Sequence, residues 1–216
     1  MRTDPTALFS GSIKRALSQT LPGGQAQSRM APDPLDAPQP ERTAPAKDSA
    51  VLVLLYPTSS GFGVLLTERS QNVAHHKGQV SLPGGQKEPG DESLWQTALR
   101  EAWEETGVEP QAVERLGALS PIYIAGSHFC VQPFVGSTLV RGIWRPHPPE
   151  VAALLEMPLE RLVDDGIKRT AQWPWVNGVR RVPYYALDGR IIWGATAMIL
   201  SEFEVLLRGI HSDHSD

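Results

Sequence analysis

The segment from Asp91 to Thr106 constrains the fold most, because it has the length, the end signals and the two-faced pattern of an α-helix. We expect Asp91 to cap its start and Gly107 to end it, since a short acidic side chain and a glycine suit those positions. At about 100° per residue, its apolar side falls at Trp95, Leu99, Ala102, Trp103 and Thr106. Such a helix needs a sheet or another helix against that side.

The opposite face of this helix carries Arg100, Glu101, Glu104 and Glu105 within an arc of roughly 140°. Glu101 and Glu105 are four residues apart, so their like charges destabilise an isolated helix. A hard divalent cation such as Mg²⁺ would reverse this repulsion, because it takes oxygen ligands from carboxylates and phosphates. We expect Arg100 to pair with Glu104 and to hold the acidic residues in place.

The run Pro83-Gly84-Gly85 lies shortly before this helix. Glycine lets the main chain approach a ligand or metal closely. A strand, a glycine turn and an acidic helix could therefore form a cradle for a metal-bound diphosphate. The alternative is a solvated helix face beside an ordinary glycine turn, and for an isolated acidic helix this alternative is the more common case.

Strand patterns elsewhere in the chain predict a mixed architecture of helices and strands. Residues 50–56 and 62–67 predict a hairpin, and residues 179–187 and 190–193 predict a second one around Asp188-Gly189. Shorter strands are expected at 78–82, 115–120, 129–139 and 152–157, and an amphipathic helix at 195–208. The expected fold class is α/β (α+β), a mixed β-sheet sandwiched between helices.

The first 47 residues combine a predicted amphipathic helix over 6–20 with a stretch over 25–47 that contains five prolines. We expect this stretch to be an extended arm without a core of its own. The arm is compatible with a homodimer. The globular domain is expected over 48–210, followed by a disordered tail over 211–216.

Length and composition exclude several classes of function. The 216 residues, 41% of them hydrophobic, suit one domain with a full core, and the net charge of −4 argues against a nucleic-acid partner. The apolar run over 51–56 is too short to cross a membrane, and the N-terminus lacks a secretory signal. With the single cysteine Cys130, we expect a cytoplasmic protein without a membrane partner. Organelle targeting through the segment around Lys14 and Arg15 is the alternative.

Gly85, Asp91 and the run Arg100-Glu101-Ala102-Trp103-Glu104-Glu105-Thr106-Gly107-Val108 resemble the Nudix box, G-x5-E-x7-R-E-U-x-E-E-x-G-U. Asp91 stands in place of the first glutamate, and eight residues rather than seven separate it from Arg100. The resemblance implies a Nudix fold over nearly the full length of the chain.

The segment before the box resembles the signature of the coenzyme A pyrophosphatase-like branch, LLTxR(S/A)xxxRxxxGxxxFPGG. Its residues here are Leu65-Leu66-Thr67-Glu68-Arg69-Ser70 and His76-Lys77-Gly78-Gln79-Val80-Ser81-Leu82-Pro83-Gly84-Gly85. Ala74 replaces the second arginine of the signature and Leu82 replaces its phenylalanine. Loss of that arginine removes a potential phosphate ligand.

The resemblance implies Mg²⁺ as the cofactor, with Mn²⁺ as a substitute. Glu101 and Glu105 would be the main metal ligands, with further contributions from Glu104 and from the carbonyl oxygen of Gly85. The residues expected to act in catalysis are Glu104, Glu105 and Glu150, with Glu150 as the first candidate for the general base and Glu104 as the second. The residues expected to contact the substrate are Arg69, His76, Lys77 and Gly84. Glu150, Arg69 and Lys77 could instead be solvated charges, and His76 a structural histidine.

The implied reaction is Mg²⁺-dependent hydrolysis of the diphosphate bond in coenzyme A or its derivatives, which gives adenosine 3′,5′-bisphosphate and (acyl-)4′-phosphopantetheine. The alternative is a Nudix diphosphatase that acts on ADP-ribose, NADH or a modified nucleoside triphosphate. A non-catalytic nucleotide-binding Nudix module is less favoured, because all three box glutamates are present. In each case the partner is a small nucleotide-like molecule.

Overall fold

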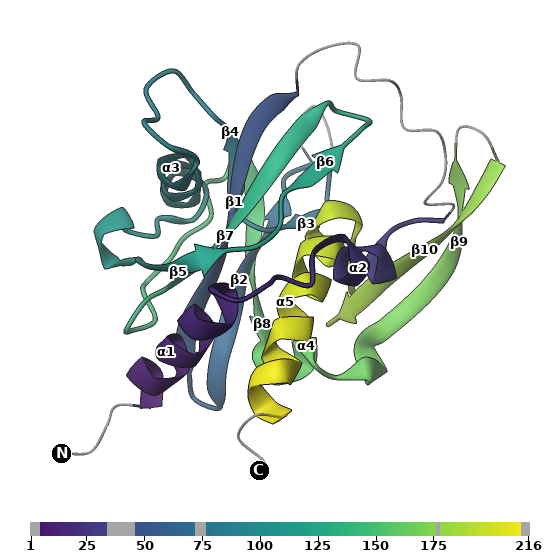
Figure 1. Cartoon of the computed structure of the whole chain (residues 1–216). Coiled ribbons are helices and arrows are strands. Elements are labelled where there is room, and N and C mark those ends of the chain that lie inside the picture. The colour runs from purple at the N-terminus through teal and green to yellow at the C-terminus, as the bar shows by residue number, and fades with distance from the viewer. Residues whose placement is uncertain (1–4, 34–45, 72–76, 176–177, 213–216) are drawn as a thin grey trace.

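The computed structural model of the chain describes residues 5–33, 46–71, 77–175 and 178–212. Within them, a large sheet lies between helices, and a smaller sheet lies beside it (Figure 1). The large sheet has the order β3 (Val80–Ser81), β2 (Gly61–Arg69), β1 (Lys47–Thr58), β7 (Phe129–Ser137) and β5 (Glu114–Ala118). Beside this path, β4 (Gly84–Gln86) pairs with β1, β6 (Ile122–Ile124) with β7, and β8 (Val151–Pro158) with β2. Because β1 and β7 are parallel and β1 and β2 antiparallel, the sheet is mixed, as predicted.

The side chains of β1 alternate between two hydrophobic cores, as the two-residue period of a strand requires. Leu52 and Leu54 belong to the core that α3 (Leu94–Thr106) covers. Val53 belongs to the core on the other face, which α5 (Gly194–Ser212) covers. Full burial of each such side chain contributes about 1.5–3 kcal/mol. The two cores confirm the predicted sheet between helices (Figure 1).

The smaller sheet has the order β11 (Arg190–Trp193), β10 (Gly178–Leu187) and β9 (Lys168–Trp175). The predicted hairpin between β10 and β11 is present, and its turn residues Asp188 and Gly189 have φ of 48° and 80°. Positive φ at both positions suits a two-residue hairpin turn. Strand β9 was not predicted, because its residues alternate only between exposed and half-buried positions.

The N-terminal part differs from the extended arm that was predicted. Helix α1 (Pro5–Leu17) is present, but the chain then forms α2 (Gly23–Gln27) and a short 3₁₀ turn. Ala26 and Met30 are only 1% and 4% exposed, and Ser201 of α5 donates to the carbonyl of Ala26 at 2.8 Å. The prediction of an extended arm was wrong for residues 25–30, which are helical and pack on α5. Residues 34–45 of the expected arm lie outside the described residues.

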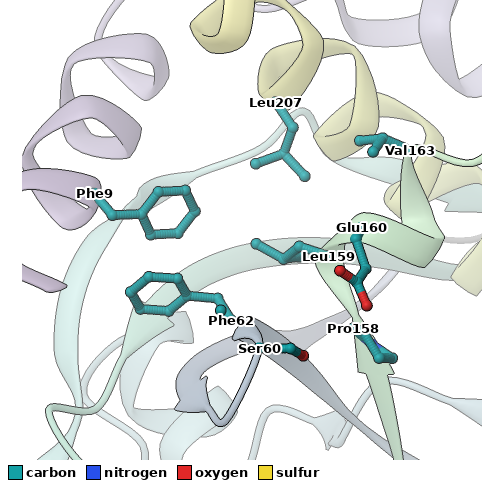
Figure 2. A pocket seen from close by; sticks show the side chains of 9 residues that line it. Phe9, Ser60, Phe62, Pro158, Leu159, Glu160, Val163 and Leu207 are labelled. Atoms are coloured by element: carbon teal, nitrogen blue, oxygen red, sulfur yellow. The ribbon is translucent and has the colours of Figure 1, made fainter. Parts of the chain in front are cut away.

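Helix α1 lies over the turn of the first hairpin. Phe9 stacks on Phe62 with the ring centroids 4.2 Å apart and the planes 23° apart (Figure 2). The rings line one side of an apolar hollow of about 330 Å³, which α4 (Leu159–Leu162) and α5 complete. Among the described residues that line it, Glu160 is the only titratable one. The hollow therefore lies where a helix packs on a hairpin, and its described lining offers few side chains that could act in catalysis.

The N-cap of helix α3 lies two residues after the expected one. Ser93 occupies the N-cap position, and its hydroxyl accepts from the backbone N–H of Gln96 at 3.2 Å. Asp91 is not the cap, because its carboxylate binds an arginine of the helix instead. Gly107 ends the helix as predicted, with φ of 72° in the left-handed region that favours glycine.

The C-terminal helix continues further than predicted, to Ser212, and the rest of the expected tail, residues 213–216, lies outside the described residues. Within the described ranges, no helix has both the length and the apolar character needed to cross a bilayer.

Candidate functional site

The site begins at the glycine bend formed by β4. Strand β4 pairs with β1, with Gly84 opposite Val51 and Gly85 opposite Ala50, and this places the bend beneath α3. Gly84 has φ of 153°, and a Cβ there would lie 2.3 Å from the carbonyl oxygen of Ala50. Only glycine fits this position. The backbone N–H of Gly84 is free to donate to the carboxylate of Glu105 at 3.2 Å.

Gly85 lies directly against a second carboxylate of the same helix. A Cβ at Gly85 would lie 2.5 Å from a carboxylate oxygen of Glu101. The carbonyl oxygen of Gly85 accepts from the hydroxyl of Ser49 at 2.7 Å. The structure thus brings together Gly84, Gly85 and two of the predicted metal ligands.

Arg100 holds the acidic face in position through four acceptors. Its guanidinium makes two bonds of 3.0 Å to Asp91, one of 2.9 Å to Glu101 and one of 3.3 Å to Glu104. A fifth bond of 3.1 Å reaches the carbonyl oxygen of Gln86. The predicted pair of Arg100 with Glu104 is present. The hydrogen bonds from Arg100 lower the pKa of Asp91 to about 2.

The exposure of the two carboxylates at the bend differs from the alternative of a solvated helix face. Glu105 is only 4% exposed, and the side chain of Glu101 is 16% exposed. Burial raises the pKa of Glu105 to about 8, and the charges of Glu101 and Glu150 add to the rise. Burial also raises the pKa of Glu101, against the opposing effect of Arg100. Burial therefore disfavours the charged form of both carboxyl groups.

Arg69 and Glu150 approach the site from the strands beside the bend. Arg69 ends β2, opposite Val151 of β8, and the backbone N–H of Ser70, the next residue along the chain, donates to the carbonyl of Glu150 at 2.7 Å. The positive charge of Arg69 lowers the pKa of Glu105, and the negative charge of Glu150 raises it. The buried Nε of Arg69 has no hydrogen-bond partner in the described part of the chain. Arg69 thus keeps donor capacity for a ligand.

The other predicted substrate contacts are less well placed. Lys77 is exposed in the turn that leads to β3, where the N–H of Gly78 donates to the carbonyl of Arg69 at 3.0 Å. Lys77 therefore lies in the segment next to the site without a contact to its carboxylates. His76, the remaining prediction, lies outside the described residues.

The donors at the bend fit a hard divalent cation in their chemistry. They are carboxylate oxygens and one backbone carbonyl oxygen, which are the ligands that Mg²⁺ and Mn²⁺ prefer. Burial raises the pKa of Glu105, and a bound cation would lower it by favouring the ionised form. Among the described side chains, no three His, Cys, Asp or Glu are grouped closely enough to hold a metal ion as they stand. Arg100 instead occupies oxygens of Glu101 and Glu104.

A groove beside the carboxylates was missed by the sequence-based analysis. It has a volume of about 530 Å³, and its lining consists of Trp103, Glu104, Gly107, Arg145, Pro146, His147 and Glu150. Trp103 was assigned to the core, but it is 51% exposed. Its helical angle lies at the edge of the apolar face, where the position alone does not decide between core and solvent. Arg145 and His147 carry no sequence signal, because a loop brings them to the helix.

The fold and the site together define a class, namely a mixed-sheet protein that holds an acidic helix against a glycine bend. A family model described as NUDIX domain matches residues 46–177, which include the bend, the helix and Glu150. The chain belongs to the Nudix family, as the box residues predicted.

Named relatives agree with this family. The chain is 36% identical over 168 residues to Nudix hydrolase 22, chloroplastic, of Arabidopsis thaliana, a match that covers 74% of this chain and 55% of that protein. It is 36% identical over 162 residues to the uncharacterized Nudix hydrolase NudL of Pectobacterium atrosepticum, which covers 72% of this chain and 80% of that one. The chain thus spans little more than half the length of its plant relative.

Solved structures share the fold. A C. elegans Ap4A hydrolase in a binary complex has a TM-score of 0.50 at 16% identity, over 76% of this chain and 98% of that one. A MutT/nudix family protein from Enterococcus faecalis has the same TM-score and identity, over 96% of this chain and 76% of that one. At this identity the likeness concerns the fold alone.

Proposed function

We propose that the protein is a divalent-cation-dependent diphosphatase that hydrolyses coenzyme A or its derivatives to adenosine 3′,5′-bisphosphate and (acyl-)4′-phosphopantetheine. One observation carries the proposal. The partly buried carboxyl group of Glu101 and the buried one of Glu105 lie against Gly85 and Gly84, in a chain that belongs to the Nudix family. A structural role alone gives no reason to withdraw two ionisable groups four residues apart from water.

The choice of coenzyme A rests on the segment between β2 and β4. Its residues resemble the coenzyme A pyrophosphatase-like signature, and the segment ends in the glycine bend that contacts both carboxylates. Arg69, which the signature includes, has a buried Nε without a partner within the described residues and acts electrostatically on Glu105. Leu82 replaces a phenylalanine of the signature and is 3% exposed, so this departure exchanges one core side chain for another.

The cation would be held by Glu101 and Glu105, with Glu104 and the Gly85 carbonyl as further ligands, and Mg²⁺ is the first choice before Mn²⁺. When bound, it would neutralise the diphosphate and lower the pKa of the attacking water. Arg100 is a positioning residue, because its bonds to Glu101 and Glu104 fix the direction of those carboxylates before a ligand arrives.

The remaining roles belong to Arg69 and to two carboxylates. Arg69 would donate to a phosphate oxygen, since a guanidinium matches that geometry. Glu150 is exposed and close enough to affect the pKa of Glu101 and Glu105, so it is our first candidate to accept the proton of the attacking water. Glu104, with its side chain 49% exposed, is the second candidate.

A substrate panel tests the proposed reaction. The purified protein is assayed with Mg²⁺ on coenzyme A, ADP-ribose, NADH and an oxidised nucleoside triphosphate, and the products are separated by chromatography. We expect coenzyme A to have a kcat/KM at least about tenfold above the others, because each missing recognition contact costs about a factor of ten or more. A higher kcat/KM for any other member of the panel would replace the proposed substrate by that one.

The Glu105→Gln variant tests the site itself. We expect its kcat on the best substrate to fall at least about 100-fold, because a neutral amide cannot compensate the charge of the cation. Glu109→Gln, an exposed carboxylate just after the helix, is the matched control and should keep full activity. Turnover of Glu105→Gln at the wild-type rate would show that the carboxylate has no part in the reaction.

We further propose a cytoplasmic protein that acts on a small nucleotide-like substrate and whose N-terminal arm is compatible with a homodimer. The names of two plant relatives contain "chloroplastic" and "mitochondrial", so the compartment needs its own test by a fluorescent fusion in cells. Analytical ultracentrifugation of the full chain decides the assembly, since a single species with the mass of one chain would contradict the dimer.

A further inference from the structure

The groove beside the carboxylates has fixed walls. One wall is the last turn of α3, and the other is the segment from Arg145 to Glu150. The N–H of Arg145 donates to the carbonyl of Thr106 at 2.9 Å, and that of His147 donates to the carbonyl of Glu105 at 3.0 Å. These bonds tie the segment to the end of the helix. The groove of about 530 Å³ has the size of a small-molecule site.

Trp103 gives the groove an aromatic wall. The side chain is 51% exposed on the helix that carries the carboxylates, and it lines the groove next to Glu104. The half-exposed ring on a rigid helix leaves part of the indole open to a ligand in the groove. A flat indole face binds nucleobases of any sequence by stacking.

The groove carries both acidic and cationic side chains. Glu104, Glu150 and Arg145 all line it, and the backbone of Arg145 is bonded to the last turn of the helix. Arg145 is exposed, and within the described residues its guanidinium has no ion-pair partner. The groove therefore holds a cationic donor in the same hollow as two carboxylates.

We propose that this groove binds the nucleoside half of the substrate, with the base stacked on Trp103 and a second phosphate, carried by the ribose, at Arg145. This assignment rests on the proposed function, because it starts from a diphosphate at the candidate cation site. A guanidinium pairs with a phosphate in two parallel hydrogen bonds, so Arg145 distinguishes a nucleotide that carries the additional phosphate from one that lacks it. Trp103 and Arg145 thus determine specificity, and neither touches the reacting atoms.

Binding of the nucleotide half alone tests this inference without turnover. Adenosine 3′,5′-bisphosphate and AMP are titrated by calorimetry into the wild-type protein with Mg²⁺ present. We expect the bisphosphate to bind about tenfold more tightly than AMP. Trp103→Ala should weaken both ligands about tenfold, and Trp103→Phe should restore both to within about threefold of the wild type. Arg145→Gln should remove the preference for the bisphosphate and leave AMP nearly unchanged.

Matched controls come from the small sheet, where Arg180 lies 4.8 Å from the ring centre of Trp175. Arg180→Gln and Trp175→Phe should leave both affinities unchanged. The inference is overturned if the wild type does not bind the bisphosphate, if Trp103→Ala binds as the wild type does, or if Arg145→Gln weakens both ligands equally. Arg145 is exposed, so its variant should fold in any case.

The two proposals fail separately. If binding of the bisphosphate depends on Trp103 and Arg145 while coenzyme A is not cleaved, the proposed reaction is wrong and the groove assignment stands. If coenzyme A is cleaved while both variants bind as the wild type does, the groove assignment is wrong and the reaction stands.

Discussion

Gly84 and Gly85 are glycines for two different physical reasons. Gly84 has a positive φ and touches the backbone of β1, so any side chain there would strain the strand itself. At Gly85 the three atoms nearest to a Cβ all belong to the carboxylate of Glu101. The first glycine is therefore required by the fold, and the second by the side chain that it faces.

Gly85→Ala should separate activity from stability. The added methyl would push the carboxylate of Glu101 away, because a long side chain can move while the strand stays in place. We expect kcat to fall about 10- to 100-fold, as for other changes that misdirect a metal ligand, with a small change in Tm. Gly90→Ala is the control, since nothing lies within 4 Å of its Cβ position. Wild-type activity of Gly85→Ala would contradict the role given to Glu101.

Asp91 should make a pH-dependent contribution to stability. Its pKa is lowered from 3.8 to about 2 in the folded state, so its contribution is complete above about pH 4 and disappears as the pH falls through about 2. At neutral pH we expect Asp91→Asn to reduce the free energy of unfolding by about 2–3 kcal/mol, through the lost charge-assisted bonds to Arg100.

The contribution of Asp91 to the free energy of unfolding is measured by denaturant unfolding of the wild type and Asp91→Asn at a series of pH values. The difference in the free energy of unfolding should shrink steadily between about pH 4 and pH 2. A difference that stays constant over this range would show that the carboxylate of Asp91 is not stabilised by Arg100.

At the scale of elements, α3 serves the core and the site together. Its apolar face includes Ala98 and Ala102, which pack on β1, and this packing fixes the helix above the glycine bend. Successive side chains then fall at set angles, so Glu101 and Glu105 meet the bend while Trp103 faces the groove. A rigid helix positions these groups more accurately than a loop would.

Helix α5 positions the N-terminal part of the chain in a similar way, through hydrogen bonds to the buried Glu202. Its carboxylate accepts from the N–H groups of Gly23 and Ser120 at 3.2 Å and from the amide of Gln27 at 2.9 Å. It thereby joins α2 and the connection after β5 to α5. We expect Glu202→Ala to lower the free energy of unfolding by about 3 kcal/mol, because it leaves buried donors without partners.

Chemical denaturation checks the Glu202→Ala prediction, with the exposed Glu160→Gln as a control that should change little. Activity per folded molecule should stay at the wild-type level, since Glu202 lies on the face of the sheet away from α3. An unfolding midpoint equal to that of the wild type would show that these hydrogen bonds do not stabilise the packing.

At the scale of the whole molecule, the features that depend on local patterns could be predicted from the sequence. Strand alternation gave the two hairpins, and the helical period gave α3 with its acidic face. The sheet sandwiched between helices could also be predicted, because both faces of a largely apolar strand such as β1 must be covered. The family also followed from the spacing of glycine, arginine and glutamates in one segment.

What could not be predicted depends on contacts between distant segments. Glu105 is buried because β4 comes to lie beneath the helix, and Arg145 reaches the groove because a loop returns to the helix end. The helix α2 was missed because its glycines and glutamines have no helical pattern and are ordered by packing on α5. Asp91 and Ser93 are both good caps, and only the position of Arg100 decides between them.

The central claim is that the carboxylates at the glycine bend hold a divalent cation, and Mn²⁺ binding tests it most directly. Free Mn²⁺ is followed by electron paramagnetic resonance during titration of the wild type, of the double variant Glu101→Gln/Glu105→Gln, and of the control Glu109→Gln. We predict that the double variant loses at least about tenfold in Mn²⁺ affinity while the control keeps it. A folded double variant that binds Mn²⁺ as tightly as the wild type would contradict the account.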